Sequence, residues 1–483
     1  MSLLGGYAGL GADDPNARDF ELYETILDGD LAGDDAEVMD AALLYDDTTR
    51  TENTWKIVQV IGHRVRVEGS TITGARCSGV AVGRGASDTT VRHCLFYGNR
   101  GHKGDSNPSG GALTSYGDGV HIARCEFKGN AGGLGAVVFW SRGHLEDCVF
   151  TENYSWDWGG AGYLHEGGSL TDCRFVKNRA LASGGALYFF SGDYTLSHCV
   201  FRGNVSGSGG GALACNGFAA ITDSLFAGNE AGTRGGGCIH WDGFATVVNC
   251  IFAGNRAGGV GGAWSSRWGS SVAMVNCTAL GNRASEGGFL AVAYTNESHP
   301  SEATVSNCVL CDGDTVIHWD DEVTVNVSHS CICGGMSVLR DGEKGLVQGK
   351  GNIVVDPCFV DPGYWDVNGT QDDPNDDIFV EGDYHLKSQA GRWDEGSESW
   401  VCDDVTSPCI DAGDPNTPVM HEPFPNGGVI NMGAYGGTAQ ASKSYFSGPP
   451  CETIGSKSER RRTNESGRTS VSLVFSKRVK RDA

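Results

Sequence analysis

A six-residue pattern, Cys-x-Phe-x-x-Asn, recurs through the middle of this 483-residue chain at a nearly constant spacing. A second signature, Gly-Gly-Ala, ends eight residues after most of the Asn positions, as at Ala161, Ala186 and Ala212. A repeat of this length indicates a solenoid, in which each unit buries its apolar side chains against its neighbours. The units begin at residues 94, 125, 148, 173, 199, 224, 250 and 277, with Ser in place of Cys at 224 and Ala in place of Phe at 279.

Each unit alternates apolar and polar residues over short stretches rich in Val, Phe, Thr and Leu, which Gly and Asn interrupt. This pattern predicts strands joined by turns rather than helices. About 25 residues are too few for a propeller blade, and the unit is too rich in β-formers for a helical repeat. The unit fits one coil of a parallel β-helix, whose strands stack about 4.8 Å apart. We therefore predict an all-β solenoid with the Cys and Phe of each unit in its interior.

The Asn of each unit predicts a structural ladder. Equivalent residues of successive coils lie above one another, so their side-chain amides can form hydrogen bonds along the solenoid axis. The ladder residues are Asn99, Asn130, Asn153, Asn178, Asn204, Asn229, Asn255 and Asn282.

Seven of the 18 cysteines occupy one position of successive units. At the strand spacing, their Cβ atoms lie beyond the roughly 3.8 Å that a disulfide prefers. We therefore predict buried free thiols that act as small apolar side chains.

Two other patterns have the spacing of metal ligands. Cys308-x-x-Cys311 with Cys331-x-Cys333 offers four thiols for zinc, but Cys308 continues the interior ladder, so no zinc site is expected. Residues 28–33 resemble half of a calcium loop, but Ala32 and Met39 stand where ligands are needed. A turn is predicted there, with no cofactor, and calcium remains the alternative.

The charge balance excludes nucleic acid as a partner of the main body. The chain has 36 Lys and Arg against 60 Asp and Glu, a net charge of −24, whereas affinity for phosphate backbones depends on cations. Residues 455–483 differ, with nine Lys and Arg against three Asp and Glu, and are expected to be a disordered basic tail. No apolar run is long enough to span a membrane, and the start shows no signal peptide.

The paired Phe-x-x-Asn and Gly-Gly-Ala signatures, over about 94–290, resemble the repeats of the polymorphic outer membrane proteins, which are adhesins of bacterial surfaces. Residues 356–362, 383–388, 407–413 and 431–437 resemble the end of secreted right-handed β-helix proteins of planctomycete-type bacteria. The resemblance implies a right-handed parallel β-helix of the pectate-lyase superfold on a secreted or cell-surface protein. It also implies an end segment that precedes an anchor or a dockerin-like module, which this chain has lost.

These observations predict four regions and a chain truncated at both ends. Residues 1–92 would form the first coils and a cap, 93–333 the regular solenoid, 334–454 a segment that closes it, and 455–483 the basic tail.

The strand after each Gly-Gly-Ala signature carries the candidate site. If the first and third residues after the Ala point inward, the fourth points outward. The fourth position supplies aromatic, amide, imidazole and guanidinium groups, which together suit a glycan, because flat rings pack on sugars and polar groups bind hydroxyls. The alternatives are a face covered by another segment or a partner, and an exposure without function. The candidate ligand-binding residues are Tyr116, Trp140, His165, Phe190, Asn216, Trp241 and Arg267.

Catalytic groups are sparse near this column. A β-helix lyase needs a basic side chain next to a neutralised substrate acid, and the weak candidates are His165, Glu166, His240, Asp242 and Arg267. Glu166 and Asp242 share a column but lie three coils apart, about 14 Å at the strand spacing, which is too far for a glycosidase pair. We therefore predict adhesion or polysaccharide binding. A polysaccharide lyase or glycoside hydrolase on the same face and a passive spacer are the alternatives.

Overall fold

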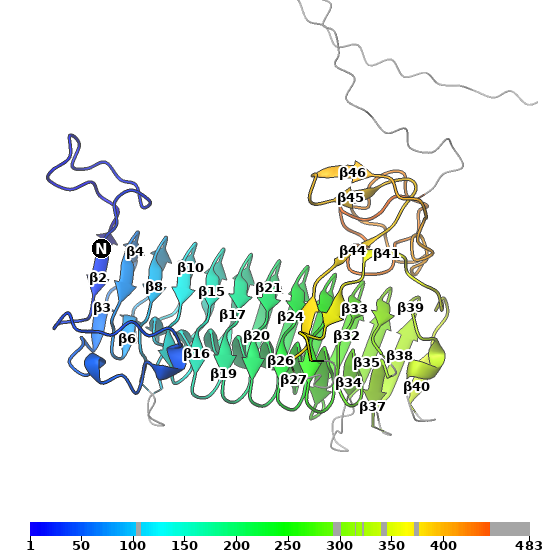
Figure 1. Cartoon of the computed structure of the whole chain (residues 1–483), viewed down its shortest axis with the longest axis horizontal. Helices are drawn as coiled ribbons and strands as arrows, with labels where there is room; N and C mark the ends of the chain where they lie inside the picture. Colours follow the sequence, from blue (N-terminus) through cyan, green and yellow to red (C-terminus); the bar gives the residue numbers. More distant parts are fainter. Residues whose placement is uncertain are drawn as a thin grey trace, which may run out of the picture.

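In the computed structural model, the chain forms an elongated right-handed parallel β-helix that carries a smaller lobe near its C-terminal end (Figure 1). The structure describes residues 1–102, 108–292, 301–313, 315–320, 323–339, 345–370 and 376–444. The predicted basic tail, 455–483, lies outside these residues. The described helices are three short 3-10 turns, η1 (Ala41–Leu43), η2 (Thr48–Arg50) and η3 (Met336–Leu339), and none could cross a membrane.

Two series of parallel strands run the length of the solenoid and join through the long strands β17 and β20 into one 22-stranded sheet. Sheet one contains β3 (Lys56–Val60), β6 (Ser78–Val82), β9 (Leu113–Ser115), β13 (Val137–Phe139), β17 (Gly162–Thr171), β20 (Leu187–Ser197), β23 (Leu213–Asn216), β27 (Cys238–Trp241), β31 (Trp264–Arg267), β34 (Leu290–Val292) and β37 (Ile317–Trp319). Sheet two contains β1 (Ser2–Leu4), β4 (Arg66–Glu68), β7 (Thr90–Arg92), β10 (Val120–Ala123), β14 (Gly143–Glu146), the second halves of β17 and β20, β24 (Phe218–Thr222), β28 (Phe244–Val248), β32 (Ser271–Val275), β35 (Glu302–Ser306), β38 (Thr324–Ser328) and β40 (Leu346–Gln348).

The remaining parallel strands complete each coil. Sheet three contains β2 (Ile26–Asp28), β5 (Thr71–Thr73), β8 (Leu95–Tyr97), β11 (Glu126–Lys128), β15 (Val149–Thr151), β18 (Arg174–Val176), β21 (Val200–Arg202), β25 (Leu225–Ala227), β29 (Ile251–Ala253), β33 (Thr278–Leu280), β36 (Val309–Cys311) and β39 (Cys331–Ile332). Sheet four contains β12 (Ala131–Gly132), β16 (Tyr154–Ser155), β19 (Arg179–Ala180), β22 (Val205–Ser206), β26 (Glu230–Ala231) and β30 (Arg256–Ala257).

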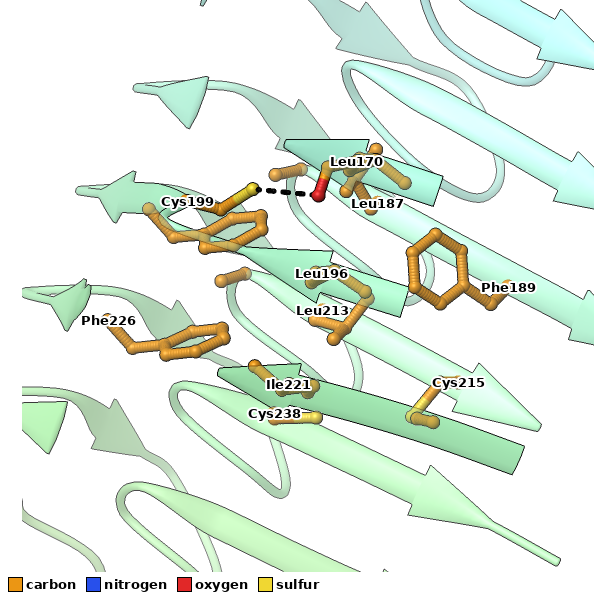
Figure 2. Close-up of a cluster of buried hydrophobic side chains, with 14 of the residues drawn as sticks. Leu170, Leu187, Phe189, Leu196, Cys199, Leu213, Cys215, Ile221, Phe226 and Cys238 are labelled. Carbon is orange, nitrogen blue, oxygen red and sulfur yellow. Dashed lines mark hydrogen bonds between the residues drawn. The ribbon is translucent and has the colours of Figure 1, made fainter. Parts of the chain in front are cut away.

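The interior follows the predicted columns. The Phe rings from Phe96 to Phe252 are fully buried and stack with centroids 4.5 to 5.0 Å apart. The ladder cysteines are buried free thiols, and Figure 2 shows the sulfur of Cys199 pointing toward Leu170 in the interior. The Cys199 thiol donates a hydrogen bond to the Leu170 carbonyl at 3.7 Å, so the thiol also satisfies a backbone acceptor. Cys311 and Cys333 form a disulfide, which removes both from the zinc pattern.

The Asn column forms a continuous ladder of side-chain amides. Each Nδ2 donates to the Oδ1 of the next Asn toward the C-terminus at 2.8 to 3.0 Å, through seven joints from Asn99 to Asn282. Each Oδ1 also accepts the backbone N–H of the preceding ladder residue, for example Asn153 N–H on Asn178. The ladder ends at Asp312, whose carboxylate accepts the Asn282 amide at 3.0 Å.

After β40 and the parallel bridge between Cys331 and Ile353, the described residues 356–370 and 376–444 leave the solenoid. They form a lobe with three antiparallel strand pairs, seen in yellow and orange in Figure 1, that lies against the last coils. Its apolar core packs on sheet three through Ala253, Leu280 and Val309. The lobe strands are β41 (Phe359–Asp361), β42 (Tyr364–Asp366), β43 (Ile378–Val380), β44 (Asp383–Leu386), β45 (Arg392–Asp394) and β46 (Ser399–Val401).

Candidate functional site

The predicted outward column stands on sheet one. Asn216, Trp241 and Arg267 are direct partners on β23, β27 and β31. The residues at the first and third positions, such as Leu187 and Phe189, are fully buried in the interior. The fourth position therefore faces outward in every described coil of this column, as the alternation of the strand requires.

Four rings of this column lie next to one another across four coils. The Tyr116 and Trp140 centroids are 6.0 Å apart, those of Trp140 and His165 5.5 Å, and those of His165 and Phe190 4.7 Å. Phe190 is 40% exposed, and the other three are partly exposed. The result is an aromatic strip, Tyr116 to Phe190, that runs parallel to the solenoid axis.

A second column, at the position two residues after the Ala, lies on the same side of sheet one and packs against this strip. Tyr163 on β17 and Tyr188 on β20 are stacked in register with centroids 5.7 Å apart. Trp158, from the turn before β17, packs on Tyr188 at 5.1 Å. Burial raises the pKa of both tyrosines. Tyr163, Tyr188 and Trp158 were not predicted from the sequence, although the alternation of the strands places both tyrosines on its outer side.

Several polar atoms on this face have no hydrogen-bond partner among the described residues. Trp140 Nε1 and His165 Nδ1 are buried within the strip, and Arg267 Nε is buried further along the column. Buried polar atoms are usually satisfied in folded proteins, so these three unpaired atoms are exceptions.

One catalytic candidate requires correction. His240 is the third residue after its Gly237, so its side chain points into the coil and is fully buried. Its Nε2 lies 2.9 Å from the Gly217 carbonyl, and burial lowers its pKa. His240 therefore does not reach the outward face.

The two acidic candidates are exposed but separate. Glu166 is in register with Ser191, and Gly217 and Asp242 follow in the next two coils. The described residues thus keep these two carboxylates apart.

The N-terminal turn brings three acids together. Oxygen atoms of Asp30, Asp34 and Glu52 lie within 4.8 Å of one another. Both Asp30 oxygens already accept backbone N–H groups, including that of Gly33 at 2.7 Å and that of Asp35 at 3.1 Å. These hydrogen bonds fold the chain after Asp30 into a turn.

A hollow of about 540 Å³ lies between sheet three and the lobe. Its wall includes Arg202 and Glu381, which already bind each other through two hydrogen bonds of 2.8 and 2.9 Å. The charges of Arg202 and Glu381 are therefore already paired with each other and are not free to bind a ligand.

Comparison with known proteins supports the fold. The family model of the right handed beta helix region matches residues 46–201, and that of the Disaggregatase related family matches residues 227–413. No curated protein matches the sequence. The solenoid and the first match define the chain as a right-handed β-helix repeat protein.

Two solved structures are similar at low levels. The crystal structure of pectate lyase Pel9A is 13% identical with a TM-score of 0.40, covering 85% of this chain and 95% of that one. A PL6 alginate lyase in complex with a trisaccharide is 11% identical with a TM-score of 0.31, covering 65% and 80%.

Proposed function

We propose that this protein binds polysaccharide through the outward face of sheet one, as an extracellular or cell-surface protein with an adhesive role. The observation that carries the proposal is the aromatic strip, Tyr116 to Phe190, with its partly exposed rings and unpaired nitrogens. Exposed apolar groups gathered in one place commonly mark a binding surface.

The geometry of the strip suits an extended sugar chain. One ring is presented per coil, and successive coils are about 4.8 Å apart, so a chain along the axis meets ring after ring. Trp140 Nε1 is a donor, and His165 Nδ1 donates or accepts according to its tautomer. The rings would pack on the apolar faces of the sugars while these nitrogens bind hydroxyl groups.

Binding is favoured over catalysis because the two carboxylate candidates do not form a pair and one histidine candidate is buried. His240 is inside the coil, and Glu166 and Asp242 lie three coils apart. A polysaccharide lyase or glycoside hydrolase on this face, and a passive spacer, remain the competing functions that the experiment separates.

The test is a panel of neutral and acidic polysaccharides, each with and without calcium, added to the full chain. Tryptophan fluorescence reports binding, while ultraviolet absorbance and reducing ends report product. We expect a fluorescence change without product, and a loss of affinity of about tenfold or more in Trp140→Ala, since buried aromatic contacts carry much of the binding energy at interfaces.

The matched control is Phe218→Ala, which removes a 59% exposed aromatic ring from β24 on sheet two. It should leave the affinity unchanged. Product formation would make the protein an enzyme, and silence in all three signals would favour a spacer.

A further inference from the structure

The C-terminal end of the outward face differs chemically from the aromatic strip. Here the column passes from Trp241 on β27 to Arg267 on β31, which are direct partners in adjacent coils. Trp268 extends the aromatic surface, with its centroid 6.3 Å from that of Trp241 and its plane tilted by 28°. Trp268 is 62% exposed, so a large flat ring faces solvent at this end.

Two arginines lie at this end of the face, and one of them contacts a tryptophan ring. The Arg267 guanidinium carbon lies 5.9 Å from the Trp268 centroid. Arg234 stands in the turn before β27, in the bridge column between Gly209 and Val260. Burial and then the positive charge of Arg234 lower the pKa of Arg267, whereas Asp320 raises it, so the two guanidinium groups are close enough to repel.

Asp320 acts on Arg267 through its charge but forms no ion pair with it. Among the described residues, no carboxylate lies within 4 Å of either guanidinium group. Arg267 Nε is buried without a hydrogen-bond partner, and so is Ser265 Oγ, two residues earlier on the same face of β31. On a chain with 60 Asp and Glu, two neighbouring unpaired arginines indicate a place for an anion from outside.

We infer that Arg234 and Arg267, with Trp241 and Trp268, form a subsite for a negatively charged sugar residue. The inference rests on the proposed function and adds the substrate class, a saccharide that carries carboxylate or sulfate groups. The tryptophans take the apolar face of the sugar, and the guanidinium groups bind its anionic group through charge-assisted hydrogen bonds.

The experiment measures affinities of the full chain for matched saccharides by titration calorimetry. The probes are oligogalacturonate and oligoalginate, the methyl ester of each, which keeps the backbone and removes the charge, and a sulfated carrageenan oligosaccharide. We expect the charged forms to bind at least about tenfold more tightly than the esters. We expect the Arg234→Gln/Arg267→Gln variant to lose that preference while it binds the esters as the wild type does. The carrageenan shows whether sulfate substitutes for carboxylate.

Two further variants serve as controls. Arg174→Gln removes an exposed arginine from sheet three and should change nothing, and Arg267→Lys should keep most of the charge preference. Trp140→Ala should weaken charged and neutral saccharides alike. Equal binding of charged and esterified forms, or an unchanged preference in the double variant, would overturn the inference while leaving the binding function intact. Failure of every saccharide to bind would overturn both.

Discussion

At the scale of single residues, the end of the amide ladder brings a carboxyl group into the interior. Asp312 is fully buried where the next ladder Asn would stand, and it accepts the backbone and side-chain N–H groups of Asn282. Burial raises the pKa of Asp312 to about 7, although the hydrogen bonds from Asn282 oppose this shift. The folded protein therefore holds a proton on Asp312 that the unfolded chain releases near pH 4.

Because this pKa is raised on folding, the contribution of Asp312 to stability is largest below pH 4 and is lost as the pH rises toward 7. Asp312→Asn removes the ionisation and keeps an amide oxygen for Asn282. The wild type should lose unfolding free energy between pH 5 and pH 8, and the variant should not. The difference in unfolding free energy between variant and wild type should therefore be about 2–3 kcal/mol larger at pH 8 than at pH 5. Urea unfolding at both pH values measures the difference. Asp242→Asn, at an exposed site, is the control, and an equal effect of Asp312→Asn at both pH values would contradict this account.

Strand alternation in the sequence predicted the orientation of some side chains but not of others. Alternation correctly placed Leu187 and Phe189 inside. The same rule places the third-position residue His240 inside and the second-position residue Tyr163 on the outer side, but it was not applied to them. The Cys311–Cys333 disulfide was beyond this reasoning. The segment from Leu310 to Asp312 is one residue shorter than the segment from Phe to Asn in the other units. The positions of the side chains there therefore cannot be read from the repeat.

At the scale of the structural elements, the amide ladder has a direction. Every ladder amide donates toward the C-terminus and accepts from the N-terminal side, so the amide dipoles point the same way. The donor end meets the Asp312 carboxyl group, in the same sense that acidic groups favour the N-terminus of a helix.

A substitution in the middle of the ladder breaks four hydrogen bonds at once. Asn178 accepts the backbone and side-chain N–H of Asn153 and donates to the Phe150 carbonyl and to Asn204. Asn178→Ala should lower the free energy of unfolding by about 3 kcal/mol or more, because buried partners are left unsatisfied. Urea denaturation measures this loss. The control Asn216→Ala, on the outward face, should cost less than about 1 kcal/mol, and similar losses in the two variants would argue against a stabilising ladder.

At the scale of the whole molecule, a change in one turn column marks where the lobe docks. The residue before the first position of each unit has a left-handed backbone, and it is His198 before Cys199 and Asp223 before Ser224. In the coils under the lobe, it is Asn249, Asn276 and then Asn307. The Asn249 amide donates to two lobe carbonyls at 2.7 Å, and that of Asn276 donates to the Asn431 carbonyl at 2.8 Å. This change from charged side chains to Asn was visible in the sequence, but only the structure shows what it binds.

Two turn glycines allow a matched test of docking. Gly254 and Gly228 both have a φ of +60°, but a Cβ on Gly254 would lie 2.0 Å from the Phe379 ring of the lobe, whereas one on Gly228 would meet nothing within 4 Å. Gly254→Ala should therefore displace the lobe, and Gly228→Ala should cause only the shared backbone strain. Hydrogen exchange of residues 376–444 should accelerate in the first variant alone. Equal exchange in both variants would mean that Phe379 does not hold the lobe in place.

The uniform joints of the amide ladder also make the length of this protein adjustable. Each joint between Asn99 and Asn282 repeats one donor–acceptor pair, so a coil duplicated or deleted as a whole leaves the same pair on either side. Tandem duplication within this range would lengthen the outward face in steps of about 4.8 Å, while the lobe stays on the same terminal coils. In evolutionary terms, the reach of such a surface can change by gene duplication without redesign of either end.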